Sequence, residues 1–186
     1  MGSEAAALLE AADFAAGKHK GQRRKDPEGT PFINHPIAVA RILAQEAGVT
    51  DTVVLQAALL HDTVEDTDTT LAEIEARFGA EVRRVVAEVT DDKGLPAAER
   101  KRLQIERAPG SSARARLVKL ADKLHNLRDL NRCTPAGWSP ERVQEYFRWA
   151  AQVVAGLRGT SPPLEAALQR LFEERGVAPG PAPPGP

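Results

Sequence analysis

The spacing of apolar residues constrains the fold of this chain more than any other feature. In the first segment Ala7, Leu8, Ala11, Ala12 and Ala15 recur at steps of three and four residues, which places them on one face of a helix. No segment shows the apolar and polar alternation of a half-buried strand. The sequence therefore predicts an all-α fold. Further helices are expected around 37–43 and over 51–64, 70–78, 80–90, 97–107, 112–131, 140–157 and 163–175.

Start and stop signals agree with this pattern of helices. Thr70 and Glu73 have the spacing of a capping box, and Ser139 and Ser161 each precede a proline, as N-cap residues often do. Glycine readily adopts the positive φ that ends a helix. The glycines near the expected helix ends are Gly48, Gly79, Gly159 and Gly176.

The length of the chain suits one domain. Its 186 residues can enclose a core that needs no disulfide or structural metal. We expect residues 1–176 to form a single compact helical bundle around Leu, Val, Ile and Ala side chains. The remaining segment, 177–186, is rich in proline and glycine and has little to bury, so it is predicted to be a disordered tail.

Charge and cysteine content exclude several classes of protein. The formal net charge is −1, so the chain lacks the basic excess of a general nucleic-acid or membrane-surface binder. Cys133 is the only cysteine, which rules out an intramolecular disulfide and favours a reducing compartment. The N-terminus shows no targeting signal, and the apolar run at 53–60 is too short to span a membrane. We therefore expect a cytoplasmic protein without nucleic-acid or membrane partners, whose oligomeric state the sequence leaves open.

One run of the sequence ends an apolar segment with four side chains that carry chemistry. His61, Asp62, Glu65 and Asp66 follow the apolar residues 57–60, and on a continuous helix their three- and four-residue spacings bring them together on one face. Carboxylates crowded in this way repel one another unless a cation compensates them. Two interpretations of this run alone remain open: a metal site, or a helix end with solvated acids and a hydrogen-bonded core histidine.

Two other segments add donors of the same kind. His35 begins an apolar helix 26 residues before His61, and Asp122 lies in an apolar setting 60 residues after Asp62. Two imidazoles and two carboxylates suit an octahedral Mn²⁺, Fe²⁺ or Mg²⁺ better than a thiolate-rich zinc site. Such a cation with open positions can make a bound water more acidic and hold a phosphoryl oxygen.

The order of these histidines and aspartates resembles the signature of the HD-domain metal-dependent phosphohydrolases. Three segments, FINHP at 32–36, LHDTVED at 60–66 and VKLADKLHN at 118–126, look like the hydrolase domain of the RelA/SpoT alarmone enzymes. The length is similar to that of the stand-alone small alarmone hydrolases, the metazoan SpoT homologues. The resemblance spans about residues 4–175 and implies the HD-domain helical bundle.

The resemblance also implies roles for the residues that match. Glu65 and Asp66 match an acidic pair that handles the attacking water, and the sequence leaves open which of them is the base. The positions that match the family's metal ligands, for one Mn²⁺ per chain, are His35, His61, Asp62 and Asp122.

Further matching positions imply contacts with a nucleotide. In the basic segment 19–25, Arg24 matches an arginine that stacks on the nucleobase and Lys25 matches a lysine that meets phosphate, and a flat guanidinium suits stacking and phosphate recognition. Asn126 lies on the helix face of the Asp122 position and matches a substrate-contacting asparagine. His125 lies off that face and is expected to support the ligands or to pack.

The aromatic residues near the end of the chain are less informative. Arg142 and Tyr146 stand four apart and fit equally well a cover over the nucleotide or ordinary helix packing. Trp138 and Trp149 are expected to pack in the core or at its rim, because their spacing suggests no stacking platform.

The resemblance implies a Mn²⁺-dependent phosphohydrolase that removes the 3′-diphosphate of guanosine 3′,5′-bis(diphosphate) and releases GDP and pyrophosphate. One alternative keeps the metal site and changes the substrate to the 2′-phosphate of NADPH, and no residue separates the two. A second alternative is a non-catalytic helical module that binds a nucleotide or a protein. That module predicts an incomplete ligand set, whereas all the matching positions are filled here.

Overall fold

The computed structural model describes residues 2–181 and confirms the all-α prediction. Within these residues no strand forms, and the only β-type pairing is an isolated bridge between Arg23 and Pro31. A short 3₁₀ turn, Ala108–Gly110, precedes the longest helix. The helices are α1 (Glu4–Lys18), α2 (Asn34–Gln45), α3 (Thr52–Leu60), α4 (Thr63–Asp66), α5 (Leu71–Phe78), α6 (Ala80–Val89), α7 (Ala97–Arg107), α8 (Ala113–Arg132), α9 (Pro140–Ala155) and α10 (Pro162–Glu174).

Most of the predicted helix boundaries are confirmed by their caps. The Thr70 side chain accepts a hydrogen bond from the Glu73 N–H, and the Ser139 side chain accepts one from the Arg142 N–H. Ser161 begins α10 without such a bond, since Pro162 and Pro163 lack an N–H to donate. The Glu165 carboxylate accepts the N–H groups of Gly159, Thr160 and Ser161 just before the helix. The glycines expected at helix ends all have positive φ: Gly48, Gly79, Gly159 and Gly176.

The prediction of one helix over 51–64 was wrong, because α3 ends at Leu60 and α4 begins at Thr63. Two side chains take the carbonyls that a continuing helix would use. The Thr63 hydroxyl donates to the Leu60 carbonyl at 2.7 Å, and His61 Nδ1 lies 2.6 Å from the Ala58 carbonyl. Such bonds compete with the backbone ladder, so the chain turns at Asp62 and redirects the residues that follow.

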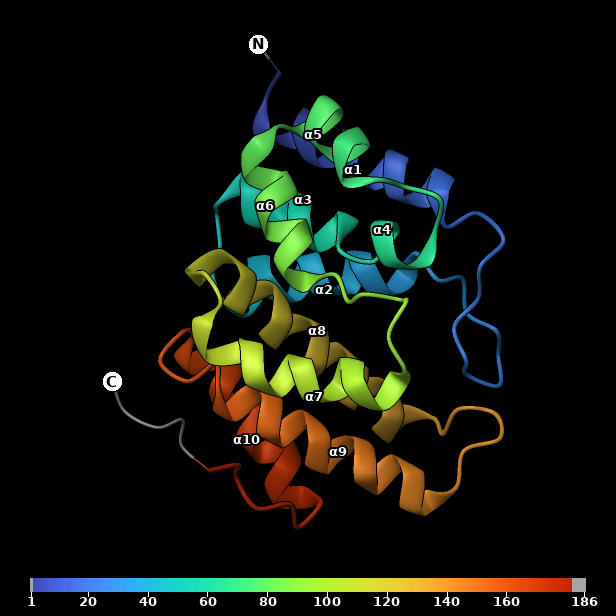
Figure 1. Ribbon diagram of the computed structural model, residues 1–186, viewed down its shortest axis with the longest axis vertical. Helices are drawn as coiled ribbons and strands as arrows, with labels where there is room; N and C mark the ends of the chain where they lie inside the picture. Colours follow the sequence, from blue (N-terminus) through green and yellow to red (C-terminus); the bar gives the residue numbers. More distant parts are fainter. Residues whose placement is uncertain (1, 182–186) are drawn as a thin grey trace.

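The helices are arranged in two groups on either side of α8 (Figure 1). Helices α1 and α5 lie at one end of the long axis, and α9 and α10 lie at the other. Helix α8 packs against α2, α3 and α6 on one side and against α9 and α10 on the other. Apart from Thr52 and Gln56, helix α3 is apolar, as expected of a helix enclosed by others. Leu60, Leu120, Leu124, Leu127 and Leu157 form part of the fully buried core.

The end of the described chain packs against the bundle without forming a helix. Val177 is 8% exposed, and the Gly180 carbonyl accepts a hydrogen bond from Arg158. Residues 182–186 of the expected tail lie outside the described residues, so the disordered tail and the domain boundary at 176 stay predictions. Among the described helices, none has the length and apolar character needed to cross a bilayer.

Glycine substitutions are predicted to have opposite effects at two positions. Gly79 joins α5 to α6 with φ +92°, so Gly79→Ala is expected to lower the free energy of unfolding by about 1–2 kcal/mol. Gly17 lies inside α1, where an added Cβ meets nothing within 4 Å, so Gly17→Ala is expected to raise it by about 0.5 kcal/mol. Urea unfolding followed by circular dichroism measures both, and equal effects at the two sites would contradict the backbone argument.

Candidate metal and nucleotide site

Four side chains from different helices meet at the centre of the bundle. His35 comes from the first turn of α2, His61 and Asp62 from the break between α3 and α4, and Asp122 from α8. His35 Nε2 lies 2.9 Å from Asp122 Oδ1 and 3.5 Å from Asp62 Oδ2. His61 Nε2 lies 3.1 Å from Asp62 Oδ2 and 3.3 Å from Asp122 Oδ1. The structure thus brings together all the residues that the sequence suggested as metal ligands.

The chemistry of this cluster fits a divalent cation. The donor atoms of His35, His61 and Asp62 all lie within 4.8 Å of one another, and Asp122 is in hydrogen-bond range of both imidazoles. Neighbouring ligands of an octahedral ion with bonds near 2.1 Å lie about 3 Å apart, which matches these separations. Mixed nitrogen and oxygen donors without thiolates suit Mn²⁺, Fe²⁺ or Mg²⁺.

The electrostatics of the cluster agree with this assignment. Burial lowers the pKa of His61, but Asp62 and Asp122 more than offset that effect and hold it well above its usual range. Burial raises the pKa of each aspartate, but the nearby positive groups leave both lowered, Asp122 the more strongly. The cluster therefore stabilises a positive charge at its centre, and a divalent cation can take the place of the proton.

The remaining ring nitrogens of the two histidines are engaged. His61 Nδ1 faces the Ala58 carbonyl at 2.6 Å, so this nitrogen carries the proton and Nε2 is left as a donor atom for a metal. His35 Nδ1 lies 2.7 Å from His125 Nδ1. Burial and the neighbouring His35 lower the pKa of His125 to about 4, so His125 is neutral at physiological pH.

Lys123 supports the cluster and was not singled out from the sequence. Its Nζ lies 3.0 Å from Asp122 Oδ2 and 4.8 Å from the centre of the Trp149 ring, and the side chain is almost completely buried. Burial lowers its pKa, but the Asp122 charge more than offsets that effect and the pKa is raised. The available signal was a lysine next to Asp122 within an apolar helix, where a buried ammonium needs a carboxylate partner.

The acidic pair expected to handle water lies one turn beyond the cluster. The Asp91 N–H donates to Glu65 Oε1 at 2.7 Å, so this bond engages only one of the two carboxylate oxygens. Burial raises the pKa of Glu65 to about 7, and the charges of Asp91, Asp62 and Asp66 act in the same direction against that hydrogen bond. Burial and Asp62 also raise the pKa of Asp66, which Lys93 at 3.7 Å opposes.

The Arg24 loop lies on the other side of the cluster. Between α1 and α2 this loop is closed by two backbone hydrogen bonds, from Arg24 N to the Thr30 carbonyl and from Phe32 N to the Gln22 carbonyl. Arg24 Nη2 donates to Asn126 Oδ1 and to Asp129 Oδ2, each at 3.0 Å. Asn126 Nδ2 in turn donates to Asp122 Oδ1 at 3.3 Å. Hydrogen bonds therefore connect the Arg24 side chain to the His/Asp cluster.

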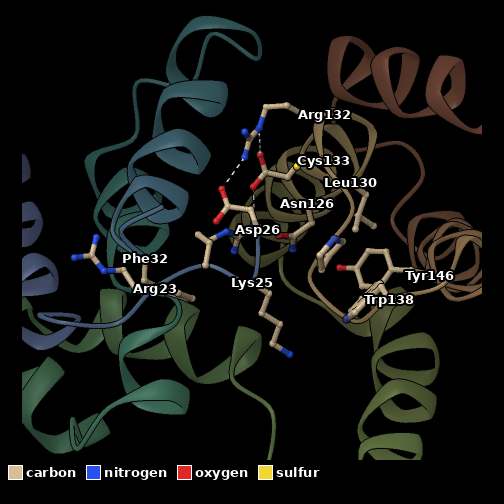
Figure 2. A pocket seen from close by; sticks show the side chains of 13 residues that line it. Arg23, Lys25, Asp26, Phe32, Asn126, Leu130, Arg132, Cys133, Trp138 and Tyr146 are labelled. Atoms are coloured by element: carbon tan, nitrogen blue, oxygen red, sulfur yellow. Dashed lines mark hydrogen bonds and ion pairs between the residues drawn. The ribbon is translucent and has the colours of Figure 1, made fainter. Parts of the chain in front are cut away.

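Two cavities meet at this connection. The first, of about 280 Å³, is shown in Figure 2 and is lined by Arg23, Arg24, Lys25, Asp26, Phe32, Asn126, Asp129, Leu130, Arg132, Cys133, Pro135, Trp138 and Tyr146. The second, of about 250 Å³, contains the His/Asp cluster together with Glu65 and Asp66. Four residues line both cavities: Arg24, Phe32, Asn126 and Tyr146. The first cavity combines several cationic side chains with aromatic rings, as a nucleotide requires.

The structure brings some of the remaining predicted residues to the cavities and leaves Arg142 outside them. Tyr146 lines both cavities and Lys25 lines the first, so both are brought to the site. Arg142 lines neither cavity and lies over the Trp138 ring at 4.2 Å. Its guanidinium therefore meets the first cavity only through that tryptophan. Trp138 and Trp149 pack against the core as expected, but each also lines a cavity.

Several lining residues were missed because tertiary contacts place them. Asp91 and Gln104 reach the second cavity from the segment after α6 and from α7, and Gln104 donates to Asp91 at 2.7 Å. Asp129 reaches Arg24 across 105 residues of sequence. The one available signal was the seven-residue spacing from Asp122 to Asp129, which places both on one helix face.

Comparison with known proteins identifies the class. The family model described as HD domain matches residues 11–168, so the chain belongs to the HD-domain family. It is 77% identical over 177 residues to the mouse guanosine-3′,5′-bis(diphosphate) 3′-pyrophosphohydrolase MESH1, covering 95% of this chain and 99% of the relative. The fruit-fly protein of that name is 56% identical over 172 residues, with 92% and 96% covered. The chain therefore belongs to the family of these animal pyrophosphohydrolases within the HD-domain class.

A solved structure agrees with this assignment. It matches with a TM-score of 0.92 and 54% identity over 96% of this chain and 99% of that chain. That protein is described as a metazoan orthologue of SpoT that hydrolyses ppGpp and plays a role in starvation responses. The fold and the arrangement of the helices are thus those of the family.

Metal affinity is predicted to depend on Asp122 and not on the carboxylate two turns further along α8. Asp122→Asn removes a charge in contact with both imidazoles, so Mn²⁺ binding is expected to weaken by more than about 100-fold. Asp129→Asn removes a charge that pairs with Arg24 but keeps a side-chain oxygen facing His125 Nε2, so it is expected to change Mn²⁺ affinity by less than about threefold. Isothermal titration of metal-stripped protein measures both, and comparable losses would show that the cluster is not the binding site.

Proposed function

We propose that the chain is a Mn²⁺-dependent phosphohydrolase that removes the 3′-diphosphate of guanosine 3′,5′-bis(diphosphate), with GDP and pyrophosphate as products. The corresponding pentaphosphate would give GTP. The main support for this proposal is a wall shared by the two cavities and formed by Arg24, Phe32, Asn126 and Tyr146. A nucleoside held in the first cavity would extend a ribose-linked phosphate along this wall into the second. The activity for which the mouse and fruit-fly relatives are named supports the choice of guanine nucleotide.

His35, His61, Asp62 and Asp122 would hold the cation, since their donor atoms converge and suit Mn²⁺. When bound, the cation supplies a Lewis acid that offsets negative charge on a phosphoryl oxygen and makes a nearby water more acidic. The protein contributes the rigid donor set, because each ligand comes from a helix or from a helix end packed in the core.

Glu65 is the proposed general base. Its Oε1 is held by the Asp91 N–H, so Oε2 would accept the proton of the attacking water. A pKa of about 7 is close to the value at which a general base is most effective at neutral pH. Asp66 would orient the same water, with its backbone carbonyl fixed by the Gln22 amide at 2.6 Å.

The reaction replaces one P–O bond by another. The water oxygen bonds to the phosphorus attached to the ribose 3′-oxygen, and the bond from that phosphorus to the 3′-oxygen breaks. The proton held at Glu65 then goes to the 3′-oxygen, which leaves as a hydroxyl on GDP. No covalent intermediate with the protein is required.

Binding of the nucleotide falls to the first cavity. The Arg24 guanidinium would stack on the base, because its plane is already held by Asn126 and Asp129 and lies near the Phe32 ring at 5.9 Å. Lys25, exposed at the mouth of the cavity, would meet phosphate. Asn126 would contact the ribose or the phosphate beside it, and Tyr146 would close the wall between the cavities.

The products distinguish the substrates. Metal-stripped protein supplied with Mn²⁺ is expected to release pyrophosphate and GDP from guanosine tetraphosphate, and Asp62→Ala is expected to lower the rate by at least about 1,000-fold because it removes a ligand. Anion-exchange chromatography of the products is the measurement. Orthophosphate and NADH formed from NADPH would instead support the 2′-phosphatase activity. If neither nucleotide is cleaved, the enzyme proposal fails and a nucleotide-binding module becomes the better account.

The pH dependence tests the assignment of Glu65. Because the carboxylate is the form that accepts a proton, kcat is expected to rise with pH through the pKa of Glu65 and to level off above it. A bound cation favours the carboxylate, so the midpoint should lie at or below about 7. Glu65→Gln is expected to lower kcat by at least about 100-fold and to abolish the rise of kcat with pH through this midpoint. If kcat of the variant still rose with pH through the same midpoint, another group would be the base.

A further inference from the structure

We propose that His125 is a positioning residue that fixes the tautomer of His35 and thereby sets the affinity of the metal site. The inference rests on the proposed function only in taking His35 as a metal ligand. His125 Nδ1 lies 2.7 Å from His35 Nδ1, and the two ring centres are 4.9 Å apart. At this separation one nitrogen must donate and the other must accept.

The surroundings of the two rings decide which nitrogen donates. Asp129 Oδ1 faces His125 Nε2 at 3.9 Å, which favours a proton on that nitrogen of His125. With its proton on Nε2, His125 offers the Nδ1 lone pair to His35. His35 then carries its own proton on Nδ1 and presents an unprotonated Nε2 to the carboxylates of Asp62 and Asp122.

The second imidazole reaches the same state by a different route. His61 Nδ1 is held by the main-chain carbonyl of Ala58, which no side-chain substitution removes. His35 depends on a side chain instead. The affinity of the site can therefore be changed at His125 without altering any ligand, because a bond to the outer nitrogen fixes the orientation and basicity of a metal-binding histidine.

The position of His125 makes the test feasible. Its side chain is 19% exposed and lines a surface hollow with Arg41, Gln45 and Arg128, so a ring or amide of similar size has room. Arg128 gives a matched control, because it joins α8 to α2 through Glu46 at 2.7 and 2.9 Å and does not contact the ligands. Loss of that ion pair disturbs the packing of the same two helices without touching His35.

Three variants separate the hydrogen bond from simple packing. His125→Phe keeps a ring and removes the acceptor. His125→Asn places an amide oxygen where Nδ1 stood, and His125→Gln places its amide group one bond further out, where Nε2 stood. The experiment is titration of metal-stripped protein with Mn²⁺ alone, in which electron paramagnetic resonance measures the free ion. Circular dichroism and thermal unfolding verify that each variant is folded.

His125→Phe and His125→Gln are expected to weaken Mn²⁺ binding by about 10- to 100-fold, whereas His125→Asn returns it to within about threefold of the parent. Arg128→Gln is expected to leave it unchanged. At saturating Mn²⁺, His125→Phe should recover the parental kcat with an unchanged KM for the nucleotide, since only occupancy of the site is affected.

Three results would overturn the proposal: parental Mn²⁺ affinity in folded His125→Phe, equal affinity in His125→Asn and His125→Gln, or the same loss in Arg128→Gln. The Mn²⁺ titration needs no substrate, so a failure of the proposal about His125 can be told apart from a failure of the proposed function. A parent that binds Mn²⁺ through His35 but cleaves neither nucleotide would end the enzyme proposal and leave the role of His125 intact.

Discussion

A positive charge at the meeting point of His35, His61, Asp62 and Asp122 is the interaction on which the rest of the structure depends. Buried carboxylates within 3.5 Å of buried imidazoles are stable only if a proton or a cation lies between them. The bundle meets this requirement by bringing helix ends to one place. The break after Leu60 turns the chain so that Asp62 faces the cluster while Glu65 and Asp66 follow on the next turn, and Lys123 holds the outer oxygen of Asp122.

Arg24 extends this electrostatic arrangement to the first cavity. Through Asn126 it is joined to Asp122, and through Asp129 it approaches His125. The His/Asp cluster and the first cavity thus share one helix, α8, whose residues 122–129 contribute to both. In the proposed reaction this short helical segment would keep the distance between a bound base and the reacting phosphorus nearly constant, which is the condition for efficient positioning.

The sequence predicted the convergence of His35, His61, Asp62 and Asp122 and most helix ends, because these depend on local patterns and on motifs with fixed spacing. Thr70 and Gly79, for example, act as the local rules require. It did not predict the break at His61, because the bonds of Thr63 and His61 to carbonyls three residues back compete with the helix, and the spacing of apolar residues does not show which arrangement forms. Lys123, Asp91 and Asp129 were missed for a related reason: each gains its role from a partner that only the fold brings near. The four-residue spacing of Arg142 and Tyr146 left open whether Arg142 covers a nucleotide or packs, and here its guanidinium lies over the Trp138 ring.

The pairing of charges in the first cavity affects how it can select a substrate. Asp26 lies 3.2 Å from Arg132, and Asp129 lies 3.0 Å from Arg24, so two of the cavity's cations are already matched by carboxylates. This pairing fixes the guanidinium planes before a nucleotide arrives, at the cost of net positive charge. Attraction of polyphosphate then falls mainly to exposed side chains such as Lys25, where solvent screens the charge. In the proposed reaction, discrimination between nucleotides would therefore come from the shape of the aromatic wall and from where it places the ribose-linked phosphate, rather than from charge alone.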